Sequence, residues 1–139
     1  MNPVINPIVS IKRALERRLA TLSLPTAYEA STFNPVPNQL YLRVSFIISP
    51  PDDPVLGDKY YRERILFQVF VCDVLNKGTA NAFTVAQQVR ELFDKGFFAN
   101  EDNVCINVIS TPDIRSSIVT QDRLVVPVSI DILGEVWRG

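Results

Sequence analysis

The most chemically suggestive segment is SPPDDPVLGD at residues 49–58, where Asp52, Asp53 and Asp58 lie close together. Carboxylate oxygens can bind a hard cation such as Ca²⁺. Their spacing matches no regular calcium loop, however, and Pro54 interrupts it. Aspartate beside proline is also common in simple turns. We therefore expect a surface loop here without a bound metal.

Cys72 and Cys105 are the other candidates for chemistry, as a nucleophile or a redox pair. A reactive cysteine needs a base or an environment that lowers its pKa, but the sequence contains no histidine. Each cysteine lies inside a strand-like apolar run, which favours small buried side chains in a reducing cytosol. No glycine-rich phosphate loop, zinc spacing or paired carboxylates occur either. We expect no catalysis, metal or cofactor.

Composition limits the possible partners. The chain has 139 residues, of which 47% are hydrophobic, and 14 Lys and Arg oppose 15 Asp and Glu. This size fits one domain spanning residues 1–139. Binding to duplex DNA needs a surplus of cations, so free nucleic acid is not the expected ligand. No run of 18 apolar residues predicts a membrane span, and no secretory signal is visible.

An amphipathic helix of about four turns is predicted after Pro7, which suits the first turn of a helix. Its apolar stripe recurs at steps of three and four residues, and Pro25 prevents its continuation. The opposite side is basic. It is either a solvated surface, a contact for DNA phosphates or a contact for acidic groups of another subunit. The apolar stripe contains Ile8, Ile11, Leu15, Leu19 and Leu22, and the basic face contains Lys12, Arg13, Arg17 and Arg18.

Two strands are predicted on either side of the 49–58 loop. Apolar residues alternate with polar ones over residues 40–48, and again from Arg62 to Val71, whose last residues are apolar on both faces. The first strand is therefore half-buried and the second is central in a sheet. If the two are neighbours, a polar face forms opposite the core. This face is either solvated or used between subunits, and it contains Arg43, Arg62, Arg64 and Gln68.

A second helix follows the turn at Asn76–Thr79, with Gly96 as its expected left-handed C-terminal cap. Phe83 lies off its apolar stripe and is either a partner anchor or covered by a loop of the chain itself. Residues 104–108 and 124–132 alternate as two more strands. Pro127 lies inside the last one, which indicates an edge or a bulge because proline cannot donate to a strand ladder.

The resulting order is helix, strand, strand, helix, strand, strand. Each helix has one apolar stripe and can therefore cover one patch of sheet. We predict an α+β domain with a mixed, mainly antiparallel sheet of four to five strands and both helices packed on one face. The other face of the sheet would be polar and charged, or covered by a neighbouring subunit.

Several stretches resemble the tail terminator proteins of long-tailed bacteriophages, in order and over nearly the full length of the chain. The resemblance rests on the order of these stretches, since none of them is diagnostic alone. They are PTAYEASTFNP, LYLRVSF, the loop containing Leu56 and Gly57, RERILFQVFVCD, ANAFTVAQQVRELFDKGF and VVPVSIDI.

The resemblance implies a structural subunit without enzymatic activity, found in the tail or neck of a virion and assembled in the host bacterial cytoplasm. It would form a homo-hexameric ring, largely monomeric when free, that caps the tail-tube protein and offers a surface to the head-tail connector. DNA would only pass through the ring. We expect the tube or connector to contact the loop residues Pro50, Pro51, Asp52, Asp53, Pro54 and Leu56.

Two alternatives remain at this point. One is another neck or head-completion protein of the same particle. The other is a small ligand-binding or enzymatic domain that uses the 49–58 loop or the face carrying Arg43 and Arg64.

Overall fold

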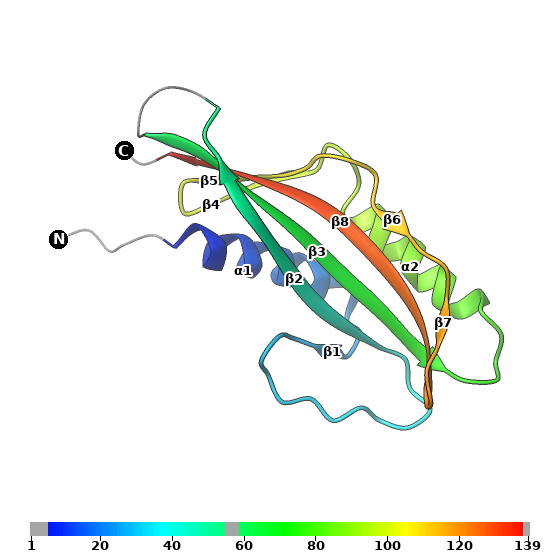
Figure 1. Ribbon diagram of the computed structural model, residues 1–139. Helices are drawn as coiled ribbons and strands as arrows, with labels where there is room; N and C mark the ends of the chain where they lie inside the picture. Colours follow the sequence, from blue (N-terminus) through cyan, green and yellow to red (C-terminus); the bar gives the residue numbers. More distant parts are fainter. Residues whose placement is uncertain (1–5, 55–58, 138–139) are drawn as a thin grey trace.

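Three long antiparallel strands form the centre of the computed structural model, which describes residues 6–54 and 59–137. They are β2 (Tyr41–Asp52), β3 (Tyr60–Val74) and β8 (Arg123–Trp137), with β3 in the middle. Helices α1 (Pro7–Leu19) and α2 (Ala80–Leu92) both lie behind this sheet in Figure 1. The predicted two layers, with both helices on one face and the second strand in a central position, are confirmed.

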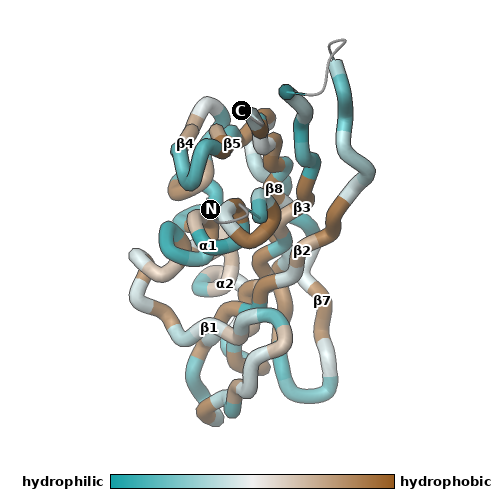
Figure 2. Tube along the Cα trace, turned by 90° about the vertical axis from the view of Figure 1, so that its left-hand side faces the viewer, coloured by the Kyte–Doolittle hydropathy of each residue, from teal (hydrophilic) through white to brown (hydrophobic). Residues whose placement is uncertain are grey.

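Strict alternation along these strands separates a buried face from an outer one. Figure 2 shows the hydrophobic stretches concentrated in the central strands, whereas the far end of the β2–β3 hairpin is hydrophilic. Since neighbouring strands are in register, side chains of one parity gather on the helix side. These buried residues are Leu42, Val44 and Phe46 on β2, Ile65, Phe67, Val69 and Val71 on β3, and Val126, Val128, Ile130 and Ile132 on β8.

The sheet is larger than predicted. Its strand order is β1-β2-β3-β8-β5-β4, with β6 and β7 also paired to β8, and β1 runs parallel to β2. The expected number of four to five strands is therefore wrong. The missed strands contain only two to four residues, too few for an alternation to show. The shorter elements are β1 (Thr26–Ala27), β4 (Phe98–Glu101), β5 (Val104–Val108), β6 (Asp113–Ile114) and β7 (Ile118–Val119).

Helix α1 begins where its sequence predicts. The Asn6 side chain accepts a hydrogen bond from the Val9 N–H at 3.2 Å, and Pro7 occupies the first turn. A short 3₁₀ turn, Ala20–Leu22, extends the helix before Ser23 turns left-handed at φ 57°. The buried Ile11 lies over Gly134 of β8, where an added Cβ would come within 2.6 Å of the Ile11 Cδ1. The missing side chain thus permits this close approach.

Helix α2 packs through an aromatic cluster centred on Phe67. The Phe67 ring stacks on Phe46 with a centroid distance of 4.8 Å and meets the edge of Phe93 at 5.5 Å. Phe93 is completely buried and Phe97 continues the cluster at 6.4 Å. This cluster joins the strands to both the end of α2 and the turn that follows it. No helix in the described part of the chain is long and apolar enough to cross a membrane.

The predicted cap at Gly96 is wrong. Helix α2 ends at Leu92 and its C-cap is Phe93, whose N–H donates to the Val89 carbonyl. Gly96 does have a positive φ of 92°, but in the turn before β4, where its N–H donates to the Val108 carbonyl at 3.1 Å. The helix therefore ends before the position that the glycine suggests, because the backbone already leaves helical geometry at Phe93.

The prediction that Pro127 marks an edge or a bulge is also wrong, because β8 is central and pairs with β3 in unbroken register at this point. The Pro127 carbonyl accepts from the Arg115 N–H at 2.9 Å. In an antiparallel strand the N–H and C=O of one residue face the same neighbour. The missing N–H therefore faces the interruption between β6 and β7, and no bond to β3 is lost.

The 49–58 loop is shorter than predicted. Strand β2 continues to Asp52, with a register shift between Ser49 and Asp52 that accommodates Pro50 and Pro51. Prolines are tolerated at such an irregularity on an edge strand. Asp53 and Pro54 follow without regular structure, and Leu56 lies outside the described residues.

Replacing Phe67 by Ala should lower the free energy of unfolding by about 3–5 kcal/mol, because the fully buried ring leaves a cavity between two other rings. Phe98→Ala is the matched control, since Phe98 is 62% exposed and its removal should change stability by less than about 0.5 kcal/mol. Chemical denaturation of both variants measures the difference. Equal losses would show that the core is centred elsewhere.

Candidate functional site

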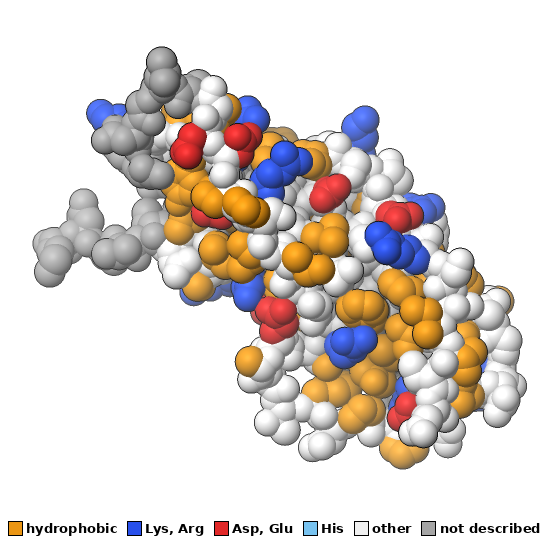
Figure 3. All heavy atoms as spheres, in the orientation of Figure 1, with side chains coloured by type: hydrophobic (Ala, Val, Ile, Leu, Met, Phe, Trp, Pro, Cys, Tyr) orange, Lys and Arg blue, Asp and Glu red, His pale blue; other side chains and the backbone are white. Residues whose placement is uncertain are grey.

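The face of the sheet opposite the helices, called the outer face below, carries a mixture of apolar and charged side chains. Figure 3 views this face from the front and shows hydrophobic and charged groups interspersed. Strand register places the side chains in cross-strand rows. Its central residues are Arg43, Ser45 and Ile47 on β2, Arg64, Leu66, Gln68 and Phe70 on β3, and Asp131 and Leu133 on β8.

Four of the residues predicted for a subunit interface do share this face. Arg43, Arg64 and Gln68 lie near its centre, and Arg62 lies towards the hairpin end. The prediction that they project from one side is confirmed, while their use between subunits stays a prediction.

Charges on the outer face are incompletely paired within the chain. The Arg43 guanidinium lies 4.2 Å from the centroid of the Phe70 ring, a favourable cation–π geometry. Arg64 is exposed, and among the described residues it makes no ion pair or hydrogen bond. Between these cations lies the half-buried Leu66, opposite the exposed Ile47. Such a surface has the aromatic, arginine and aliphatic composition that is typical of protein interfaces.

Arg62 differs from the other three because it is tied into a network at the hairpin end. Its Nε donates to the Tyr60 hydroxyl at 3.1 Å, and that hydroxyl donates to Glu135 Oε1 at 3.1 Å. The hydrogen bond with Tyr60 is the main reason that the pKa of Arg62 is raised. Asp52 adds an ion pair at 3.8 Å, and the exposed Trp137 ring lies 4.5 Å from that of Tyr60. This network fixes the ends of three strands together.

Phe83 does not belong to the outer face. It projects from α2, in the layer on the other side of the sheet, and is 36% exposed. The sequence predicts Phe83 as either a partner anchor or a residue covered by a loop of the chain itself, and the structure places it on a different surface from the four polar residues. Helical periodicity showed that it leaves the apolar stripe and could not show where it would lie relative to the strands.

The basic residues of α1 all make contacts within the chain, although Arg13 and Arg17 stay largely exposed. Arg17 forms an ion pair with Glu101 of β4 at 3.1 Å, and Arg13 forms one with Asp102, in the turn after β4, at 3.8 Å. Arg18 points to the opposite flank, where its Nε donates to the Leu92 carbonyl at 2.8 Å and its guanidinium lies 4.0 Å from the Phe97 centroid. These contacts hold α1 against neighbouring elements.

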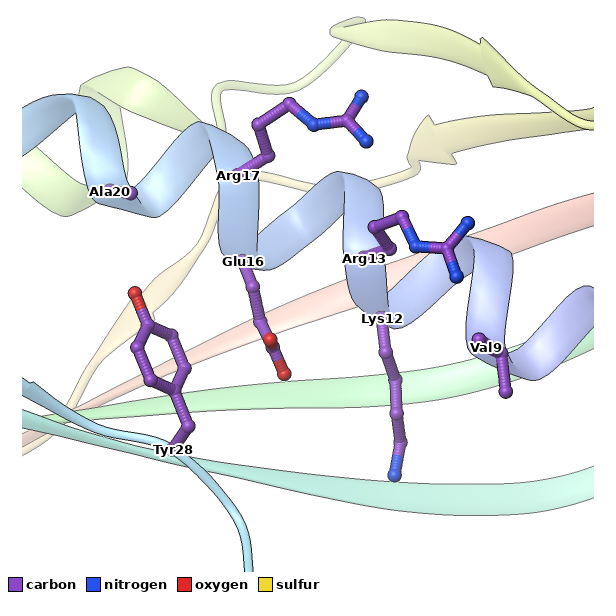
Figure 4. A pocket seen from close by; sticks show the side chains of 7 residues that line it. All are labelled: Val9, Lys12, Arg13, Glu16, Arg17, Ala20 and Tyr28. Carbon is purple, nitrogen blue, oxygen red and sulfur yellow. The ribbon is translucent and has the colours of Figure 1, made fainter. Parts of the chain in front are cut away.

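Lys12 enters a hollow of about 460 Å³ beside α1, seen in Figure 4. Lys12, Glu16 and Tyr28 point into the hollow, whereas Arg13 and Arg17 point away from it. The Lys12 Nζ forms an ion pair with Glu29 at 3.0 Å and lies 5.0 Å from the Phe46 centroid. The hollow therefore contains its own balanced charges and lacks the converging cations of an anion site.

Glu29 has a structural role at the edge of the sheet. Its Oε2 accepts from the Phe46 N–H at 2.9 Å, satisfying a strand N–H just beyond the end of β1. Burial alone would raise the pKa of Glu29, but the hydrogen bonds from Phe46 and Lys12, with the Lys12 charge, outweigh it and lower the pKa. Glu16 shows the reverse: burial raises its pKa, Lys12 opposes this, and Glu29 adds to it.

Glu63 is a buried carboxylate on the helix side of the sheet, 8% exposed and opposite Gly134 in the register. Burial raises the pKa of Glu63, and no counter-charge in the described part of the chain offsets it. It does not belong to a cluster, since no three His, Cys, Asp or Glu side chains of residues 6–54 and 59–137 are grouped to hold a metal. Both cysteines are free thiols, and burial raises the pKa of Cys72.

Arg123 is an important residue that the sequence did not reveal. It is buried, donates to the Gln39 carbonyl and to the Val36 carbonyl, the latter at 3.0 Å, and lies 5.0 Å from the Tyr41 centroid. It thus holds the long connection before β2 against the start of β8. Its partners are 84 and 87 residues away in the chain, so no local pattern signals the contact.

The sequence model of the phage tail terminator proteins matches residues 10–131. This range contains most of α1, all of β2 and β3, and β8 as far as Asp131. The chain therefore belongs to the phage tail terminator protein family.

Other similarities are more distant. The metalloendopeptidases OPG085 of vaccinia virus strain Copenhagen and of variola virus are each 25% identical over 131 residues, covering 90% of this chain. The chain spans only 21% of the length of these relatives. One solved structure has a TM-score of 0.74 at 22% identity, and the match covers 91% of this chain and 94% of that one. It supports the fold alone.

Glu29→Gln and Glu63→Gln should change stability with opposite signs at pH 7. Because folding lowers the pKa of Glu29, its ionised carboxylate stabilises the fold above the ordinary pKa of about 4.3. This stability is lost as the pH falls through the lower pKa of the folded protein. Glu29→Gln should thus cost roughly 1 kcal/mol at pH 7 and little in strong acid.

The raised pKa of Glu63 means that its charge opposes folding once the pH rises above about 4.3. Glu63→Gln should therefore stabilise the protein at pH 7 and have no such advantage in strong acid. Urea denaturation from about pH 3 to about pH 7, a range that includes the ordinary glutamate pKa, measures the stability of both variants. A destabilising Glu63→Gln at pH 7 would contradict the assignment.

Proposed function

We propose that this protein closes a finished phage tail tube as a ring of identical subunits and offers the ring to the head-tail connector. The observation that carries the proposal is the uncovered outer face of a chain in the tail terminator family. A two-layer domain normally covers one face of its sheet with its own helices. Here the second face carries Leu66 and Ile47 beside Arg64, which makes no ion pair among the described residues.

Ring closure supplies a reason for such a surface. Subunits that join through two different patches form a closed ring when the repeated rotation from one neighbour to the next returns to the first subunit. A closed ring cannot grow into a filament. Single contacts of about 800 Å² per partner can be weak, so free subunits would be largely monomeric. A tube end that aligns six of them would make the contacts cooperative. DNA would pass through the ring without sequence-specific contact.

The β2–β3 hairpin end is the proposed contact with the tube or connector. In the described residues it presents Pro50, Pro51, Asp53 and Pro54 on the surface. Arg62 and Tyr60 brace the ends of the adjoining strands, so this end is supported from within the sheet. The protein would act in the virion neck after assembly in the bacterial cytoplasm.

The proposal assigns no catalysis to this chain. A zinc peptidase holds its metal through His, Cys, Asp or Glu ligands, most often including histidine. The sequence contains no histidine, and the peptidase name belongs to proteins of which this chain spans 21%. Binding through the outer face requires no catalytic turnover.

Arg64→Glu should abolish ring formation on tube ends, because it puts a carboxylate on the proposed contact surface. Lys77→Glu is the control: it makes the same charge change in the exposed turn before α2. Electron microscopy of tail tubes mixed with each purified variant measures capped ends, and circular dichroism verifies folding. Folded Arg64→Glu protein that still caps tubes would contradict the role of the outer face.

Removing the protein during assembly should give tubes longer than normal. Normal tube length together with unattached heads would point instead to another neck protein. Tube length in lysates measured by electron microscopy separates these two functions.

A further inference from the structure

The exposed surface of α2 is unusual because it carries so little charge. The residues that face away from the core are Ala80, Phe83, Thr84, Gln87, Gln88 and Glu91, with one ionisable group among them. Arg90 is half-buried and its Nε donates to the Pro112 carbonyl at 3.0 Å. By contrast, the surface of α1 beside its hollow carries Lys12, Arg13, Glu16 and Arg17. A helix surface poor in charge and carrying an exposed Phe fits an interface better than open solvent.

This surface and the outer face lie on opposite sides of the molecule. In Figure 1, α2 lies behind the sheet whose outer face points forward. A ring with a single rotation axis needs two different patches on each subunit, since each neighbour is contacted through one of them. The separation of Phe83 from Arg64 is therefore the arrangement that a ring requires.

The two patches also complement each other chemically. On the outer face, Arg43 and Arg64 make no ion pair among the described residues. On α2, Glu91 accepts from the Gln87 amide at 3.3 Å and pairs with no cation in the same part of the chain. The apolar groups match likewise: Ile47, 49% exposed, lies on the sheet, and Phe83 lies on the helix.

We propose that, in the assembled ring, α2 of one copy covers the outer face of the next copy. This inference rests on the proposed ring function and identifies its two contacting surfaces. Each sheet would then lie between its own helices and a helix of its neighbour, burying both sides of the strands. Phe83 would act as an anchor beside Ile47 and Leu66, with Glu91 directed towards Arg43 and Arg64.

Disulfide trapping tests the contact directly. One variant carries Asp131→Cys on the outer face and another carries Gln88→Cys on α2, both in a Cys105→Ser background; the native Cys72 is only 2% exposed. The two proteins are mixed on tail-tube ends and oxidised. We expect a mixed disulfide between the variants, and a covalent ladder up to the full ring when one chain carries both cysteines. Arg13→Cys replaces Gln88→Cys in the control pair and should give no product above background.

The outcomes separate the contact from the function. Rings on tube ends without the mixed disulfide would overturn the contact and leave the ring function standing. Predominant Asp131→Cys homodimers would also overturn it, because they indicate two outer faces packed against each other. Tube ends that bind no ring of the unmodified protein would instead refute the proposed function.

Phe83→Ala provides a second measurement that needs no cross-link. It should weaken capping of tube ends at least about tenfold, as expected for an aromatic anchor, while the unfolding midpoint changes little because Phe83 is partly exposed. Thr84→Ala on the same surface of α2 is the control and should change capping much less. Unchanged capping by folded Phe83→Ala protein would contradict the proposed anchor.

Discussion

The side-chain alternation of the β2, β3 and β8 ladder is the constraint on which the rest of the structure depends. In a strand, neighbouring residues must point to opposite faces. The register of the three strands places core residues opposite core residues and outward residues opposite outward residues. Phe67 cannot enter the core without Leu66 and Gln68 facing the other way. The outer face is thus a direct consequence of building the buried one, and the chain must either solvate it or cover it with another molecule.

Charge is distributed in agreement with this division. The cations of α1 contact groups of the same chain, namely Glu29, Glu101, Asp102 and the Leu92 carbonyl. These contacts hold the helix where Ile11 lies over Gly134. Within residues 6–54 and 59–137, the arginines at the centre of the outer face form no ion pair. The proposed capping function would explain this difference, because a protein that caps a tube must keep binding groups available until its partners arrive.

Much of the fold could be predicted from the sequence, and about half of the candidate site. Period-two alternation located β2, β3, β5 and β8, and apolar stripes located both helices. The same parity argument placed Arg43, Arg64 and Gln68 on one face. Helical periodicity placed Phe83 off the apolar stripe but could not place it relative to the strands, because the rotation of a helix relative to a sheet depends on packing between them. The parity argument failed for Pro50 and Pro51, whose strand conformation depends on a shift of register with β3.

By itself, the sequence determined which side chains share a face within each element, because helical and strand periodicities are local properties of the backbone. It also excluded histidine chemistry by composition. Only the tertiary structure decided which elements meet. Arg123 reaches carbonyls more than eighty residues away, Pro127 sits in a central strand where its second neighbour is interrupted, and the basic residues of α1 find acids beyond their own helix. These contacts depend on chain topology, which brings distant segments together and leaves no trace in local spacing.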